Sequence, residues 1–197
     1  MKDNPKKDRG RNRGNDGEGR DDAVENENAL AMLMRQHREV DALFERFEES
    51  DAGSPESMAI VQDIAFALNV HARIEEEIFY PAAREALGED GKDLLDEAAV
   101  EHATLKQLLV DLGASLETDY FFRSKVKVLG EYVQHHVDEE ESEIFPMLQD
   151  AGLDLLELGR AMRERNDALH AAYPELALRN AENRGESGMG ASRMEGA

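Results

Sequence analysis

An eleven-residue stretch that occurs twice constrains the fold of this chain more than any other feature. Residues 71–81 read HARIEEEIFYP and residues 136–146 read HVDEEESEIFP. A shift of 65 positions superposes the histidine, the glutamate four residues later, the next glutamate and the closing proline. The same shift places His37 on His102 and matches apolar positions around them. An internal repeat that carries apolar and metal-ligand residue types together predicts an architecture of two similar halves.

Hydrophobic periodicity predicts an all-α fold. Apolar residues recur every three or four positions over residues 30–47, 60–78, 95–112 and 129–147, and more weakly over 153–173. Aromatic residues make up only 6% of the chain, which disfavours strands. We therefore expect an up-down-up-down four-helix bundle built from two repeated helical hairpins, with an extra C-terminal helix that packs outside and with disordered ends.

Capping and breaking residues place the helix boundaries. Ser54 followed by Pro55 predicts an N-cap and a first helical residue. Thr118 is a possible cap after a short link. The matched prolines, Pro81 and Pro146, are expected to end or kink their helices.

The ends of the chain differ in composition from its middle. We expect a disordered basic tail over residues 1–22, the bundle with its fifth helix over 23–173, and a mostly disordered tail over 174–197. Residues 1–20 hold seven Lys or Arg against four Asp or Glu, although the whole chain has a formal net charge of −21. That acidic charge argues against nucleic acid as a partner of the body of the protein.

Absent residue types exclude several kinds of site. The chain has no cysteine, so disulfides, thiol nucleophiles and iron–sulfur clusters are excluded. We find neither a signal-like start nor an apolar run of membrane-spanning length. The sequence therefore leads us to expect a cytoplasmic protein that has no membrane partner.

Six side chains of metal-ligand type fall on the core-facing stripes of the predicted helices. They are His37, His71, Glu75, His102, His136 and Glu140. A histidine and a glutamate four residues apart share one helix face. Buried carboxylates cost several kcal/mol each unless they are paired or bind a metal. No Lys or Arg lies on these stripes, so two divalent cations are the simplest way to balance the charge.

Three other interpretations of these residues are less consistent with the repeat. A lone core histidine is more often structural, but a set related by one shift favours a metal site. His135 and Glu139 form a second pair with the same spacing, and the repeat selects His136 and Glu140 instead. A ferritin-like centre uses Glu-x-x-His, and no histidine here has a glutamate three residues before it.

The order His, HxxxE, His, HxxxE on four helices resembles the hemerythrin-like family, also called the HHE cation-binding domain, over about residues 25–172. The resemblance implies a four-helix bundle with an oxo-bridged centre of two non-heme iron ions, which Glu75 and Glu140 would bridge. It also implies a division of the histidines between the irons, His37 with His136 and His71 with His102.

Two departures from the oxygen-carrying members bear on function. Those proteins have a further histidine where this chain has Lys106, and an aspartate where it has Glu141. Open metal positions would then favour reactions with O2, peroxide or nitric oxide. We expect a stress-response protein that binds, senses or detoxifies such a molecule. The alternative is a metal-dependent regulatory or interaction module whose iron occupancy controls partner binding. Turnover and oligomeric state are left open.

Nearby acidic and aromatic residues receive structural readings. The glutamates of residues 76–77 and 139–143 are expected to form solvated helix faces. The alternative is an acidic path along which a cation enters the site. Tyr80 and Tyr132 are expected to pack at helix ends, rather than to donate hydrogen bonds beside the metals.

Overall fold

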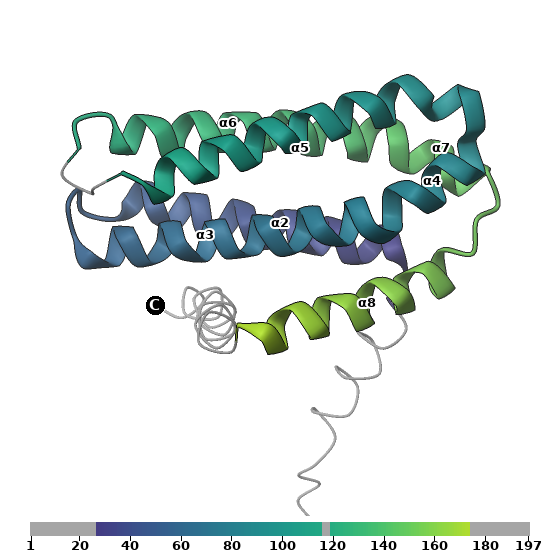
Figure 1. Ribbon diagram of the computed structural model, residues 1–197, viewed down its shortest axis with the longest axis horizontal. Helices are drawn as coiled ribbons and strands as arrows, with labels where there is room; N and C mark the ends of the chain where they lie inside the picture. The colour runs from purple at the N-terminus through teal and green to yellow at the C-terminus, as the bar shows by residue number, and fades with distance from the viewer. Residues whose placement is uncertain (1–26, 116–118, 174–197) are drawn as a thin grey trace, which may run out of the picture.

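The computed structural model describes residues 27–115 and 119–173, and these residues form helices and turns without any strand (Figure 1). Four long helices lie alongside one another: α2 (Ala29–Glu49), α3 (Pro55–Ile74), α5 (Lys92–Gly113) and α6 (Phe122–Glu139). The all-α prediction is confirmed. The predicted disordered tails and the Thr118 cap lie outside the described residues.

Local signals begin the helices where they are expected. The side chain of Ser54 accepts a hydrogen bond from the backbone N–H of Ser57, and Pro55 is the first residue of α3. Asn28 caps α2 and Asp154 caps α8 in the same way. Each cap satisfies a backbone N–H that has no partner inside its helix.

The two matched prolines do not end their helices, and an irregular helical turn precedes each of them. One turn of π-helix, η1 (Glu75–Phe79), precedes α4 (Tyr80–Leu87), which contains Pro81. The second hairpin has the same arrangement, with η3 (Glu140–Ile144) before α7 (Phe145–Asp150). A proline clashes with the carbonyl four residues before it. The wider π turn gives that carbonyl room, and the chain stays helical.

Both π turns begin at a predicted metal ligand. The N–H of Tyr80 donates to the carbonyl of Glu75, and the N–H of Phe145 donates to that of Glu140. Single π turns within α-helices occur frequently at functional sites. Here each turn sets the direction in which a buried glutamate and the residue after it point.

The apolar core consists of two clusters. One contains Leu33 and Ala98, and the other contains Val40 and Leu105. His37 lies between Leu33 and Val40 in the sequence, and His102 lies between Ala98 and Leu105 in the same way. The buried histidines therefore occupy the middle of the bundle, with apolar packing on both sides.

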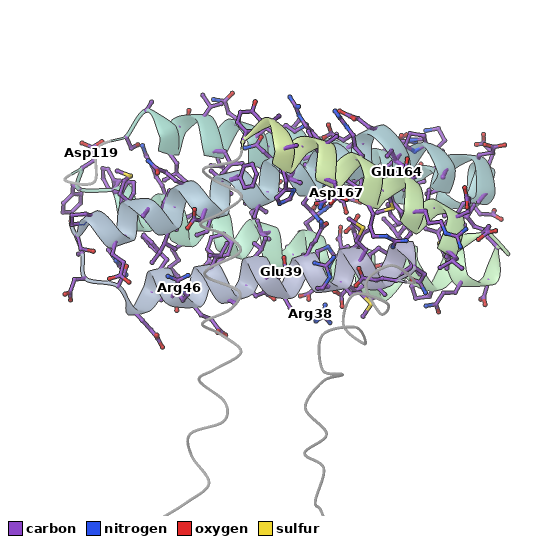
Figure 2. All side chains as sticks on the ribbon, turned by 90° about the horizontal axis from the view of Figure 1, so that it is seen from below. Arg38, Glu39, Arg46, Asp119, Glu164 and Asp167 are labelled. Atoms are coloured by element: carbon purple, nitrogen blue, oxygen red, sulfur yellow. The ribbon has the colours of Figure 1, made fainter. Side chains whose placement is uncertain are left out.

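A short 3-10 turn, η2 (Gly88–Gly91), leads into α5, and the last helix, α8 (Leu155–Ala172), packs against α2 and α3 (Figure 1). Met162 and Leu169 are the buried apolar residues of α8. A Cβ on Gly159 would lie 2.7 Å from the carbonyl oxygen of Glu27, so α8 can approach the start of α2 only with glycine there. Charged side chains such as Arg38 and Glu164 lie on the outside of the bundle (Figure 2). No described helix is long and apolar enough to cross a membrane.

Candidate metal centre

The structure brings all six predicted metal ligands together in the middle of the bundle. None of them is more than 6% exposed. Two groups of their ligand atoms are close enough to hold a metal ion, and the second group shares Glu75 with the first. The first group consists of His37, His71, Glu75 and Glu140, and the second group consists of Glu75, His102 and His136.

The histidines pair differently from the expected division. The rings of His37 and His71 are 4.9 Å apart, and those of His102 and His136 are 4.7 Å apart. Glu75 places one carboxylate oxygen 3.1 Å from Nε2 of His71 and the other 3.3 Å from Nε2 of His102. A bridging carboxylate gives one oxygen to each metal. If Glu75 bridged two metal ions, His71 and His102 would lie on different ions, and the geometry pairs His37 with His71 and His102 with His136.

The second glutamate also lies between the two histidine pairs. Oε2 of Glu140 is 3.4 Å from Nε2 of His37 and 3.8 Å from Nε2 of His136. Helix packing explains why the expected division fails. Spacing along one helix shows which residues share a face, but it does not show which residues of two different helices lie opposite each other.

Four side chains orient the histidines through their outer ring nitrogens. Gln36 accepts a hydrogen bond from Nδ1 of His71 at 2.9 Å, and Glu101 accepts one from Nδ1 of His136 at 2.7 Å. The two acceptors are related by the 65-residue shift. Because an amide or carboxylate oxygen can only accept, the proton lies on Nδ1. Nε2 of His71 then presents its lone pair to the centre, as metal-bound histidines do.

The glutamates that follow the bridging glutamates orient the other two histidines. Glu141 accepts from Nδ1 of His37 at 2.9 Å, and Glu76 accepts from Nδ1 of His102 at 3.1 Å. Lys106 donates to Glu76 at 2.6 Å. The reading of these two glutamates as solvated face residues is wrong. The repeat could have indicated their role, because the 65-residue shift superposes Glu76 on Glu141 just as it superposes Glu75 on Glu140.

Tyr80 is a further residue of the site that the sequence reading did not place there. Its hydroxyl donates to Oε1 of Glu140 at 2.8 Å and lies 3.2 Å from Nε2 of His102. The expected packing role is therefore incomplete for Tyr80. Tyr132, by contrast, packs against the apolar cluster that contains Val40, as expected.

Charge explains how the site can exist in the protein interior. Burial alone would lower the pKa values of His37 and His102, but neighbouring carboxylates outweigh burial and raise both. Burial would raise the pKa of Glu75, but His71 and His102 hold it well below its usual range. Burial and the charges of the two bridging glutamates raise the pKa of the Tyr80 hydroxyl well above its usual value. The Glu75 carboxylate is therefore ionised and the Tyr80 phenol is neutral.

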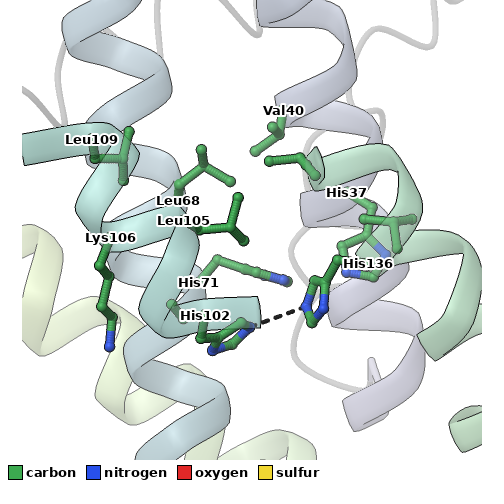
Figure 3. A pocket seen from close by; sticks show the side chains of 12 residues that line it. His37, Val40, Leu68, His71, His102, Leu105, Lys106, Leu109 and His136 are labelled. Carbon is green, nitrogen blue, oxygen red and sulfur yellow. Dashed lines mark hydrogen bonds between the residues drawn. The ribbon is translucent and has the colours of Figure 1, made fainter. Parts of the chain in front are cut away.

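Several buried atoms of the site have no well-directed hydrogen bond, although their neighbours are close. They are Nε2 of His37, Nε2 of His71, both carboxylate oxygens of Glu75 and Oε2 of Glu140. Nε2 of His102 and Nε2 of His136 are 3.0 Å apart (Figure 3). Nitrogens this close need a proton or a metal ion between them. Nitrogen and oxygen atoms that converge in this way without hydrogen-bond partners are suited to bind divalent metal ions.

A small cavity adjoins the four histidines. Its volume is about 20 Å³, and apolar side chains such as Val40, Leu68 and Leu105 line its far side (Figure 3). This volume is enough for one water-sized molecule. Lys106 also lines the cavity, and its side chain is 38% exposed. The centre thus adjoins a small apolar space with a lysine between it and solvent.

Comparison with known proteins supports the fold. An uncharacterized protein of Mycobacterium tuberculosis, Rv2633c, is 28% identical over 160 residues, which are 77% of this chain and 92% of that protein. A crystal structure of its homolog from Mycobacterium kansasii, a hemerythrin HHE cation binding domain-containing protein, superposes with a TM-score of 0.65 at 24% identity. The superposition covers 74% of this chain and 88% of that one, and it supports the fold.

Two further comparisons concern the extent of the domain. A DNA nickase of Nostoc is 30% identical over 124 residues, or 62% of this chain, which spans only 34% of that protein. Residues 28–148 match the family described as Hemerythrin HHE cation binding domain. The match covers more than half of the sequence and all six predicted ligands. The chain belongs to the hemerythrin HHE cation-binding domain family.

Proposed function

We propose that this protein holds two non-heme iron ions and uses them to bind, sense or detoxify a small molecule such as O2, peroxide or nitric oxide. The observation that carries the proposal is the set of buried Nε2 and carboxylate atoms that converge without hydrogen-bond partners. His37 and His71 would hold one iron, and His102 and His136 the other. Glu75 and Glu140 would bridge them.

The ligand set narrows the choice of metal, and family membership narrows it further. Imidazole and carboxylate ligands without sulfur suit iron, manganese and zinc, and affinity alone does not distinguish these ions. Iron is proposed from the resemblance to hemerythrin-like proteins. When bound, it would supply a redox-active Lewis acid with positions open to a small ligand.

The surrounding side chains suit a small ligand. The cavity beside the histidines admits a molecule of about the size of water, and its apolar lining excludes bulk solvent. The Tyr80 hydroxyl keeps its proton in this buried region because its pKa is raised, and it donates that proton to Glu140 in a hydrogen bond. Lys106, paired with Glu76, places a positive charge at the solvent side. A diatomic or peroxide ligand would therefore bind in a small space with apolar walls and a positive charge at its solvent side.

The sequence repeat supports a centre with two similar halves. Residues 65 positions apart make the same contacts, as Gln36 and Glu101 do with His71 and His136. We infer that the two hairpins are structural copies related by an approximate two-fold axis. Each hairpin would then provide one histidine pair and one bridging glutamate.

A metal-dependent regulatory or interaction module is the second candidate. The matched region makes up about a third of the Nostoc DNA nickase, so a related segment exists there within a longer protein. In this reading, iron occupancy would control the stability of the bundle and so its contact with a partner.

Anaerobic loading with Fe2+ followed by titration with nitric oxide tests the leading proposal. We expect a change in visible absorption that saturates with nitric oxide and requires iron. The Glu140→Ala protein should give no such change, whereas Glu143→Gln, at an exposed position on the same π turn, should behave as wild type. An iron-loaded wild-type protein that is inert to nitric oxide, O2 and peroxide would favour the module.

A further inference from the structure

The two hairpins differ on their outer faces. Helix α8 covers the face of α2 and α3, where its Asn166 contacts Gln36 at 3.3 Å. No described helix covers the corresponding outer face of α5 and α6 (Figure 1). The 65-residue shift matches three positions on the covered face with three positions on the open face. They are Gln36, Val70 and Ile74 on the covered side, and Glu101, His135 and Glu139 on the open side.

The three residues on the open side form a cluster of their own. Nε2 of His135 is 3.3 Å from a carboxylate oxygen of Glu139 and 3.7 Å from Oε1 of Glu101. One ligand atom from each residue lies within 4.8 Å of the others. The side chain of His135 is 59% exposed, so the cluster is open to solvent. Two carboxylates and an imidazole at this spacing can hold a divalent cation and leave other positions to water.

The largely buried member of the cluster turns one carboxylate oxygen toward the other two residues. Glu101 is only 5% exposed, and its Oε2 accepts from Nδ1 of His136. Its Oε1 accepts no hydrogen bond within the described chain and faces His135. None of the three residues forms an ion pair with a lysine or arginine in residues 27–115 and 119–173. His135 and His136 are thus the basic side chains that the described structure places beside these two carboxylates, and a divalent cation would balance their negative charge.

We propose that Glu101, His135 and Glu139 form a third, solvent-exchangeable site for a divalent cation on the open face of α5 and α6. The three side chains supply one nitrogen and two oxygen ligands. Glu101 then has two roles, because one oxygen orients His136 in the buried centre and the other binds the surface cation. The corresponding face of the other hairpin has an amide and two apolar residues under α8 and cannot form such a site.

Counting bound Mn2+ by electron paramagnetic resonance tests this site separately from the buried one. The full-length protein is first loaded with iron and then titrated with Mn2+, and the loss of the free-ion signal gives the number of added sites. We expect one Mn2+ per chain in the wild type. The His135→Ala protein should bind it at least about tenfold more weakly, since loss of even an indirect partner costs ten- to a hundredfold in metal affinity.

Two controls and one further variant sharpen the result. Gln134→Ala changes the exposed neighbour of His135, and Glu143→Gln removes an exposed acidic charge from the adjoining turn; both should retain the Mn2+. Glu101→Gln should weaken both the surface Mn2+ and iron retention in the buried centre. His135→Ala should weaken the Mn2+ alone.

The outcomes also separate this proposal from the proposed function. If the buried centre takes up no iron, the wild type should still bind one surface Mn2+ that His135→Ala weakens, and the third site stands. Equal Mn2+ binding by the wild type and His135→Ala, with or without iron, overturns it.

Discussion

Tyr80 and Phe145 occupy equivalent positions in the two halves of the sequence, yet only Tyr80 brings a hydroxyl group to the buried carboxylates. Its oxygen is 2.8 Å from Oε1 of Glu140. The ring of Phe145 instead stacks on His37, with 6.1 Å between the ring centroids and 11° between the planes. The pair His102 and His136 therefore lies beside a proton donor, whereas the pair His37 and His71 lies beside an apolar ring.

Replacing Tyr80 by phenylalanine should destabilise the metal-free protein by about 1–3 kcal/mol. The hydroxyl is removed while Oε1 of Glu140 stays buried and loses its donor. Urea unfolding of the metal-free protein measures the change. Tyr132→Phe is the matched control, because that hydroxyl makes no hydrogen bond to another described residue, and its effect should be within about 0.5 kcal/mol. Equal effects of the two variants would contradict the role given to the Tyr80 hydroxyl.

Removing one buried ligand should empty or cripple the centre. We expect His71→Ala and Glu140→Ala to retain fewer than two irons after anaerobic loading and desalting. The matched control is His170→Ala, because His170 lies on α8 with its Nδ1 bonded to the carbonyl of Asn166. Metal analysis provides the readout. If either ligand variant kept two irons per chain, the ligand assignment would be wrong.

The stabilisation conferred by bound metal should increase with pH. The pKa values of His37 and His102 are raised above the ordinary 6.5. Protonation of these histidines therefore stabilises the metal-free fold below about pH 6.5, and this stability is lost as the pH rises through the raised values. Metal ions bind the deprotonated rings, so their affinity rises over the same range.

Differential scanning calorimetry of metal-free and metal-loaded protein should show the gap in Tm widening from about pH 6 to about pH 8. Glu75 does not interfere, because its pKa is lowered and its contribution is lost only as the pH falls through that lowered value. A gap that is constant or narrows as the pH rises would contradict the protonation states given to His37 and His102.

The contact between α8 and the start of α2 should not tolerate a methyl group. A Cβ on Gly159 would overlap the backbone near Glu27, and we expect Gly159→Ala to lower the free energy of unfolding by about 1–3 kcal/mol. Gly113→Ala is the matched control, because a Cβ there meets no atom within 4 Å. That change should be neutral or stabilise α5 by up to about 1 kcal/mol. Equal effects would mean that α8 does not dock as described.

The repeat made the inner residues of the centre predictable from sequence. Four histidines and two glutamates lie on the apolar stripes of the predicted helices, and one shift of 65 residues relates them to one another. The structure brings all six together. The same shift also related Glu76 to Glu141, but a run of acidic residues on a helix is usually exposed. Their contacts with His102 and His37 depend on the direction that a π turn gives to the side chain after the bridging glutamate.

Other features depended on relations between helices, which periodicity does not contain. The division of the histidines between two metals requires knowledge of which helix faces which. The prolines were correctly seen as irregular positions, but a π turn lets the helix continue past Pro81. The open face of α5 and α6 could not be anticipated, because the sequence did not show which hairpin α8 would cover.

Metal analysis of the purified protein after anaerobic loading with Fe2+, together with its absorption spectrum in air, tests the central claim most directly. The account predicts two irons per chain and a charge-transfer absorption that disappears when the iron is removed. A folded protein that retains no iron would mean that the six buried side chains are structural, and the proposed function would fail with them.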